Sequence, residues 1–410
     1  MSQIISIGSY TPPWTDGKRP VRGPDEDAVT MAVAAGRAAD PRASASRVVV
    51  ISRDLPLLEG GGGAPLLAGL SLDAQTPVTE ILGAGPQTLA QIAAARPGTL
   101  VIAVDDNDTT AGAGAVLTGD TGGLTVQELA GQTRSLPVRT RDAGGHSHDY
   151  ADPRLDRELG AGATLARLRD RLDPGSPVVG LVGVTTKQVP TTGAPTVRRS
   201  SASGVVEVLA AVAESDSPGS VIALEQATAF AASVVPGTAP EITRDAADPA
   251  PLPSYRFSEG TGIPISLAAY ARAFDAKLYW QAAVIEGRDI PLIPPRAVVD
   301  DAGTLIPPDD LRPLPRSGTV YTQTTVRIPV PDLPSPYTLA VVQLDDSPVR
   351  VLLKMTGVPA GTTAIGDRGT VVFRKVADRC GIPDYGYAFW PGRPPMPADL
   401  VPTAMSGVQQ

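Results

Sequence analysis

Both histidines of the chain fall in one polar stretch, "GGHSHDYADPRL", where His146 and His148 stand beside Asp149. Imidazole and carboxylate groups ligate transition metals, and imidazole also moves protons near neutral pH. A complete metal site needs further ligands from elsewhere in the chain, so we expect no bound metal. Two interpretations stay open: a polar loop at a subunit surface, or an acid/base group that reaches into a shared cleft.

The chain has one cysteine, Cys380 in "VADRCGIPDYG". No histidine lies near it in sequence to activate it, so we interpret it as an incidental thiol rather than a nucleophile. A single cysteine also excludes an internal disulfide framework. The Gly-rich run "EGGGGAP" lacks the GK[ST] that completes a phosphate-binding loop, and it predicts a flexible connection instead.

The elements that would position such groups alternate between strands and helices over the first 235 residues. Uninterrupted β-branched and apolar runs predict buried strands at 47–52 and 99–106. The segments 24–40 and 202–215 have the composition of helices, and "ILGAGPQTLAQIAAA" (81–95) reads as a turn that opens another. This alternation predicts a layered α/β domain, interrupted by a polar, loop-like stretch from 131 to 162.

The predicted pattern of secondary structure changes after residue 255. A helix is predicted in "SLAAYARAFDAKLYWQAAVIEG", and evenly spaced strands with Gly/Pro turns follow, which favour a small all-β barrel. The predicted strands are 318–328, 337–345, 349–357 and 369–376. We therefore divide the chain into an α/β domain (1–240), a Pro-rich linker (241–254) and a helical segment plus barrel (255–410).

The bulk composition agrees with two domains and excludes some functions. A chain of 410 residues with 42 % apolar residues is long enough for two cores. The net charge of −8 argues against a nucleic-acid partner. No run approaches the ~20 apolar residues of a membrane span, and "MSQIISIGSY" is no signal peptide. We expect a cytoplasmic protein.

The opening "IISIGSYTPPW", followed by "PDEDAVTMAVAAGRAA", resembles 3-hydroxy-3-methylglutaryl-CoA synthases. Later features agree in order: "GAG…TLAQIAAA", "GAGAVLTG" after an Asp-bearing strand, and "SPGSVIALEQATAFA". The resemblance covers residues 3–235. It implies the thiolase-like fold in shortened form, which is two related α/β halves stacked in five layers and normally dimerised.

The C-terminal part resembles the OB-fold acyl-CoA-associated domain that accompanies thiolase-like proteins, through "IPPRAVV", "GTVYTQTTVRIPVPDLPSPYTLAVVQLDD" and "VRVLLKMTG". In that family two CxxC pairs flank the PPR and form a zinc hook. Here the four cysteine positions fall near Ala283, Glu286, Val299 and Ala302. None of these side chains can replace a thiolate, so we expect no zinc.

The same resemblance locates the catalytic positions of a condensing enzyme, which needs a thiolate, a base and oxyanion donors. The acyl-accepting cysteine falls on Gly85, and the later histidine falls near Gly183. The place of an Asn-Gly turn holds Arg198 and Arg199, which could contact a CoA phosphate or lie in a solvated turn. An acyl-enzyme mechanism is therefore not expected.

These departures favour a pseudoenzyme: a non-nucleophilic scaffold subunit of a thiolase-like acyltransferase or carbon–carbon bond-forming complex in specialised metabolism. It would shape the acyl-CoA or acyl-carrier phosphopantetheine tunnel of a cysteine-bearing thiolase-like or ketosynthase-like partner. A homodimer and an acyl carrier protein partner are further expectations. The resemblance supplies a precedent, because bacterial C-acyltransferase complexes combine a catalytic thiolase-like subunit, an inactive synthase-like subunit and an OB-fold protein.

Two alternatives stay open. One is an autonomous, cysteine-independent enzyme, a retro-aldol lyase or acyltransferase, in which His146, His148 or a tyrosine supplies acid/base chemistry. The other is a stand-alone module that binds acyl-CoA or an acyl carrier protein.

Overall fold

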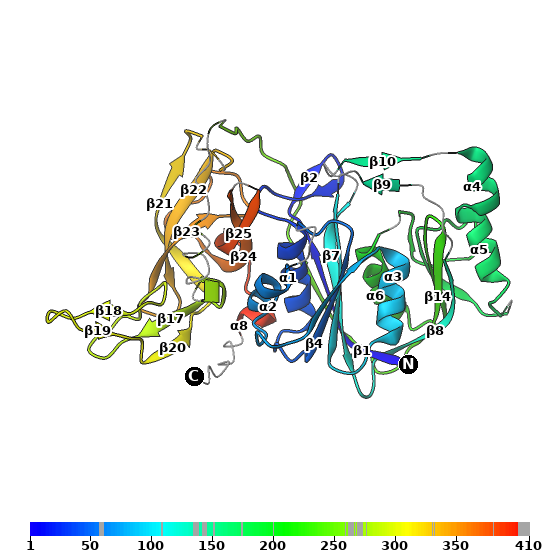
Figure 1. The fold of residues 1–410 in the computed structure, drawn as a ribbon, viewed down its shortest axis with the longest axis horizontal. Helices are drawn as coiled ribbons and strands as arrows, with labels where there is room; N and C mark the ends of the chain where they lie inside the picture. The colour runs from blue at the N-terminus through cyan, green and yellow to red at the C-terminus, as the bar shows by residue number, and fades with distance from the viewer. Residues whose placement is uncertain are drawn as a thin grey trace. The chain divides into compact units, whose positions relative to one another are not determined.

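The chain forms two compact units, each assembled from several segments (Figure 1). The computed structural model describes all residues except 57–60, 108–109, 134–138, 142–145, 151, 174, 200, 259, 261–265, 267, 269–273, 276, 330, 332, 380 and 401–410, so Cys380 lies outside the described residues. Unit 1 comprises Met1–Tyr10, Ala45–Asp54 and Pro77–Arg244, and unit 2 comprises Thr11–Ser44, Leu55–Thr76 and Asp245–Gln410. The boundaries predicted from sequence stay predictions.

Unit 1 is built on one mixed sheet of eleven strands. The strands at its two ends pair in parallel, as β-α-β crossovers require, and the strands between them pair mostly antiparallel. In spatial order the strands are β12 (Thr196–Val197), β11 (Val178–Val182), β13 (Gly219–Glu225), β14 (Thr228–Val235), β8 (Leu124–Thr133), β1 (Ser2–Thr11), β7 (Thr110–Gly119), β6 (Thr99–Asn107), β4 (Arg47–Ser52) and β5 (Val78–Leu82), while β15 (Glu241–Ala246) pairs with β1.

Helices cover both faces of this sheet. Helix α3 (Gly85–Ala94) and helix α6 (Ser203–Ser215) lie between its two halves and contact strands of both, whereas α5 (Ala161–Arg169) covers β8, β13 and β14 from outside (Figure 1). The side chains of β13 alternate accordingly: Val221 and Ala223 join the core around α3 and α6, and Ile222 and Leu224 join the core under α5. The expected layered α/β architecture is confirmed.

The polar stretch 131–162 is not the continuous loop that the sequence predicts. It holds the end of β8, a small hairpin of β9 (Arg139–Arg141) and β10 (Ser147–Asp149), and the short helix α4 (Pro153–Leu159). The Asp152 carboxylate accepts hydrogen bonds from the backbone N–H groups of Arg154 and Leu155, which caps α4. The predicted linker likewise contains β15 and the short strand β16 (Ala250–Pro251).

In unit 2, helix α1 (Ala28–Ala39) packs against α2 (Gly63–Leu70), barrel strand β24 (Arg368–Arg379) and α8 (Pro397–Leu400). Strands β2 (Trp14–Asp16) and β3 (Arg19–Val21) form a small sheet with β16.

The acidic residues before α1 form contacts with the barrel of unit 2 as well as with the start of the helix. Asp27 accepts hydrogen bonds from the Thr30 backbone N–H (2.9 Å) and the Tyr385 hydroxyl (2.8 Å), and Glu26 pairs with Arg374 (3.3 Å). The side chains of Glu26 and Arg374 are at most 3 % exposed. The sequence explains these acids by the helix dipole alone; the structure shows that they also join α1 to the barrel.

Five strands close the barrel in the order β21-β22-β23-β25-β24. Its remaining strands are β21 (Ser317–Val326), β22 (Tyr337–Leu344), β23 (Arg350–Met355) and β25 (Ile382–Pro391). Side chains of β22 alternate between buried and partly exposed, so one face fills the barrel. The expected small all-β barrel is confirmed, with β25 as a fifth strand that the sequence analysis does not predict.

The segment before the barrel contains two hairpins, one of which begins within the helix that the sequence predicts. Strand β17 (Gln281–Val284) pairs with β20 (Asp310–Pro313), and β18 (Val298–Val299) pairs with β19 (Leu305–Ile306). The predicted helix is therefore wrong at 281–284, and much of its earlier part lies outside the described residues.

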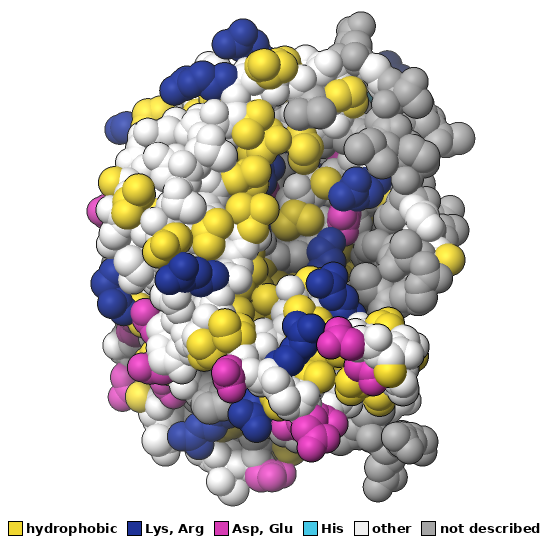
Figure 2. Space-filling view, turned by 90° about the vertical axis from the view of Figure 1, so that its left-hand side faces the viewer, with side chains coloured by type: hydrophobic (Ala, Val, Ile, Leu, Met, Phe, Trp, Pro, Cys, Tyr) yellow, Lys and Arg dark blue, Asp and Glu magenta, His cyan; other side chains and the backbone are white. Residues whose placement is uncertain are grey.

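The outer surface of the barrel is partly apolar. Tyr321 and Leu352 are exposed on β21 and β23, and the Arg350 guanidinium lies 3.7 Å from the centre of the Tyr321 ring. Figure 2 shows a band of hydrophobic side chains with lysines and arginines among them on the side where β21 and β22 lie. None of the helices in the described part of the chain combines the length and apolar character that crossing a bilayer requires.

Candidate functional site

The position that the resemblance predicts for a nucleophile lies at the start of α3, shortly after β5. Gly85 is the first residue of this helix and is buried. A Cβ atom at Gly85 would lie 3.1 Å from the Ser201 carbonyl oxygen and 3.1 Å from Cγ1 of Val182. These distances are shorter than most Cβ contacts, so a side chain added here requires Ser201 or Val182 to shift by a few tenths of an ångström.

The backbone that closes this space is held by Asp105 at the end of β6. Its carboxylate accepts hydrogen bonds from the Ser201 and Ser203 hydroxyls (2.7 and 2.6 Å) and from the backbone N–H groups of Ala202 and Ser203 (2.9 and 2.8 Å). Asp105 is 5 % exposed. With three donors directed at Oδ2 and one at Oδ1, this carboxylate caps the start of α6.

The Ser201 hydroxyl is equally occupied. It donates to Asp105 and accepts a hydrogen bond from the Gly204 backbone N–H (2.9 Å). A serine–carboxylate pair of this kind could suggest a nucleophile and its base. Here both groups complete the helix start, so the arrangement is structural.

Charged side chains at the neighbouring strand ends are paired with each other. Arg53, after β4, makes a bidentate contact with Glu225 at the end of β13, with N–O distances of 2.8 and 2.6 Å. The Asp54 carboxylate accepts from the Asp106 backbone N–H (3.0 Å) and the Asn107 side-chain amide (3.3 Å). These bonds tie the carboxyl ends of β4, β6 and β13 together.

A cavity of about 1130 Å³ lies in unit 1, but at the opposite end of the same strands. It is bounded by α5, by residues 189–195 and by the amino ends of β11 and β13, including Val178 and Ser220. Gly85 contacts Val182 and Ala223, at the carboxyl ends of those strands. The roomy cavity therefore does not lead to the position expected for the nucleophile.

The predicted acid/base residues lie on a separate small sheet. His148 stands opposite Thr140 in the β9–β10 hairpin, and Asp149 stands opposite Arg139. His146 and His148 are exposed to solvent. This hairpin is a separate sheet from the eleven-stranded one, and a catalytic role for His146, His148 or Asp149 stays a prediction.

The other predicted positions lie near the sheet edge formed by β12. Arg198 and Arg199 follow β12 directly, and both side chains are exposed. Gly183 follows β11 with a positive φ of +69°, and its N–H donates to the Val197 carbonyl oxygen (2.8 Å). The contact of Arg198 and Arg199 with a CoA phosphate stays a prediction.

The four hook positions lie in or beside the two hairpins, where Val299 stands opposite Leu305 in the β18–β19 pair. The N–H of Ala283 donates to the Leu292 carbonyl, and the Leu292 N–H donates back to Ala283. The Glu286 N–H donates to the Asp309 carboxylate (2.6 Å), and Asp300 accepts from the N–H of Ala302 (2.9 Å). Within the described residues, no three His, Cys, Asp or Glu side chains gather as a metal site would need.

Asp105 and Ser201, which lie around the head of α3, are not among the site residues predicted from the sequence. Two local signals could have found them: an acidic residue that ends a buried strand in "TLVIAVDD", and a Ser-x-x-Gly that opens a helix in "SASG". What joins them is a contact between residues 96 positions apart, which no local pattern shows.

Comparison with known proteins gives one family match, in unit 2. Residues 311–374 match the model of the ChsH2 C-terminal OB-fold domain. The matched segment spans β21, β22, β23 and the first half of β24. A closed five-stranded barrel is the architecture of an OB fold, so the resemblance stated from sequence is confirmed for this domain. A search of curated protein sequences finds no match.

Solved structures of thiolase-fold condensing enzymes match 57 % of the chain. OleA of Xanthomonas campestris matches at 13 % identity over 96 % of its length, with a TM-score of 0.46. PksG, an HMG-CoA synthase of Bacillus subtilis, matches at 14 % identity over 80 % of its length, with a TM-score of 0.44. The 3-oxoacyl-[acyl-carrier-protein] synthase III of Aquifex aeolicus matches at 14 % identity over 99 % of its length, with a TM-score of 0.42. Likeness at this level carries no activity over to the chain.

Proposed function

We propose that this protein is a non-nucleophilic scaffold subunit of an acyltransferase or carbon–carbon bond-forming complex, and that the nucleophilic cysteine belongs to a thiolase-like partner. One observation carries the proposal: the position at the head of α3 is a buried glycine pressed against the Ser201 carbonyl and Val182. Glycine carries no group that could accept an acyl chain, and a side chain added at this position needs its neighbours to shift.

An edge of the unit 1 sheet offers the partner a docking place. Among the described strands, β5 pairs only with β4, so one side of β5 presents backbone N–H and C=O groups to another chain. Leu82, the last residue of β5, is 73 % exposed. Because β5 leads directly into α3, a strand added at this edge would bring a partner close to the Gly85 turn.

The OB-fold domain gives the proposal its substrate class. The family resemblance links such domains to acyl-CoA, and we propose that this chain shapes the partner's tunnel for acyl-CoA or the phosphopantetheine of an acyl carrier protein. Arg198 and Arg199, which are exposed beside β12, are the cations that we propose for the CoA phosphate. No metal is part of this proposal.

The experiment is co-expression of this chain with a thiolase-like protein that has an intact cysteine and is encoded beside it. We expect the two to elute together in gel filtration, and acyl transfer or condensation to require both. Activity of the partner alone, with no complex formed, would reject the scaffold role. Turnover by this chain alone, lost in His148→Ala, would establish the autonomous enzyme instead.

A matched pair of variants locates the docking edge. Leu82→Lys places a charge at the end of β5, and we expect it to abolish co-elution while leaving the circular-dichroism spectrum of the chain unchanged. Val235→Lys is the control, because Val235 is a similar apolar residue, 50 % exposed, at the end of β14 in the same unit. If both variants keep the complex intact, the partner docks elsewhere.

A further inference from the structure

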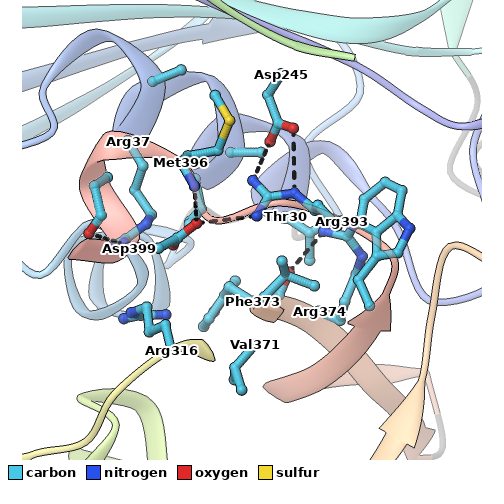
Figure 3. Close-up of a pocket in the computed structure, with 16 residues that line it drawn as sticks. Thr30, Arg37, Asp245, Arg316, Val371, Phe373, Arg374, Arg393, Met396 and Asp399 are labelled. Carbon is cyan, nitrogen blue, oxygen red and sulfur yellow. Dashed lines mark hydrogen bonds and ion pairs between the residues drawn. The ribbon is translucent and has the colours of Figure 1, made fainter. Parts of the chain in front are cut away.

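A small buried cavity in unit 2 is lined by an excess of arginines (Figure 3). Its volume is about 30 Å³, and α1, β24 and the segment that follows β25 surround it. Four guanidinium groups and two carboxylates line it: Arg37, Arg316, Arg374, Arg393, Asp245 and Asp399. No candidate residue of the function proposed above lies here.

Three of the arginines have a carboxylate partner. Asp399 lies between Arg37 and Arg393, at 3.1 and 3.0 Å, as the dashed lines in Figure 3 show. Arg393 also pairs with Asp245 at 2.9 Å. Arg374 pairs with Glu26, which lies just outside the cavity lining.

Arg316 differs from the other three. Within the described residues, its side chain donates to the Tyr387 hydroxyl (3.2 Å) and stacks 4.8 Å from the centre of that ring, and no carboxylate pairs with it. The residue is only 4 % exposed, so water does not replace the missing carboxylate at the surface. Counting the lining residues and Glu26, four guanidinium groups face three carboxylates, which leaves one positive charge.

Burial and the neighbouring charges shift the pKa values of Arg37 and Asp399. The pKa of Arg37 is lowered to about 10, first by burial and then by the neighbouring charge of Arg316. Burial alone would raise the pKa of Asp399, but Arg37, Arg393 and Arg316 together outweigh it and lower that pKa. A buried charge without a counter-charge is costly, and proteins compensate it with an ion or a partner.

We infer that this cavity binds one small monovalent anion of halide size, held by Arg316 and Arg37. The volume of the cavity limits the size of the anion that it can hold. About 30 Å³ accommodates one or two species of the size of water, since roughly 10–15 Å³ of such space suffices for one water. A phosphate group or the carboxylate end of an acyl chain is too large. The bound anion neutralises the excess charge and joins α1 to the barrel and to the segment after β25.

Bromide replacement tests the site directly in the full-length protein. We expect crystals grown in sodium bromide to show an anomalous peak within hydrogen-bond distance of the Arg316 guanidinium. Water at this place, with no anomalous signal at high bromide concentration, would overturn the inference even if every variant failed to fold.

A stability titration with a matched variant pair provides the second measurement. At constant ionic strength, replacing gluconate with chloride should raise the unfolding temperature of the wild type by several degrees and then saturate. Arg316→Gln should lose this rise. Arg368→Gln should keep it, because Arg368 forms a surface pair with Asp345 and is 72 % exposed. An equal chloride effect in all three proteins would refute a site at Arg316.

Discussion

Replacing Gly85 with alanine tests whether the nucleophile position is closed. The added Cβ meets the Ser201 carbonyl oxygen and Val182 Cγ1, both at 3.1 Å. Overpacking of a rigid interior costs about 1–3 kcal/mol. Alanine in a helix gains up to about 1 kcal/mol over glycine, and less at the first helical position. We therefore expect Gly85→Ala to destabilise unit 1 by about 1–2 kcal/mol.

Urea titration followed by circular dichroism measures the effect, and Gly162→Ala is its control. Gly162 also lies in a first helical turn, in α5, but a Cβ there would have no atom within 4 Å. Helix propensity alone then predicts a gain of about 0.5–1 kcal/mol. If Gly85→Ala were stabilising like Gly162→Ala, the space would be open and the reasoning about the head of α3 would fail.

Three further changes test other parts of the two units. Asp105→Ala leaves the four donors at the start of α6 without their acceptor, and we expect a loss of about 3–5 kcal/mol in urea unfolding, with Asp105→Asn losing less. Asp399 has a lowered pKa, so its contribution to stability is present above its ordinary value of 3.8 and is lost as the pH falls below it. Calorimetry should show this acid loss in the wild type and a shallower one in Asp399→Asn, which is already less stable at neutral pH. Burial, followed by Asp25 and Glu26, raises the pKa of Tyr255 from 10.0 to about 12, so stability should fall between these values as the unfolded phenol ionises first. Ultraviolet difference titration of Tyr255→Phe against the wild type should lose one phenol that ionises near pH 12.

Local sequence patterns were sufficient for most of the α/β elements. The β-branched run "RVVVIS" forms β4 at 47–52 as predicted, and "ASGVVEVLAAVAES" forms α6 within one residue of its predicted start. Both are long, regular apolar patterns whose period differs clearly between strand and helix. Elements of this kind need little help from distant residues.

The missed elements are those whose partners lie far away in the sequence. Strand β25 contains Pro383 and Gly386, which weaken a strand prediction, yet it pairs along its whole length with β24. Strand β8 mixes polar and apolar residues and is held between β1 and β14. Tertiary pairing overrides local preference in both, and a single sequence does not show that pairing.

The candidate site is likewise only partly predictable from the sequence. The absence of sulfur at Gly85 can be read from the sequence once the turn is aligned, but the loss of space around it cannot. That loss depends on Ser201, which Asp105 holds from another strand. The sequence therefore shows which residue stands at the predicted position, and only the structure shows how tightly its neighbours approach it.

The acidic run that carries the family resemblance shows why a supporting role suits this chain. In "DEDAVTMA", Glu26 and Asp27 bond to Arg374 and Tyr385 of the barrel, at 3.3 and 2.8 Å. This motif therefore joins segments within unit 2 and serves no chemistry at Gly85. These buried contacts fix α1 against the barrel within unit 2. Selection for a surface presented to another protein would preserve those contacts, because a displaced barrel or helix would spoil the surface even when no reaction occurs on this chain.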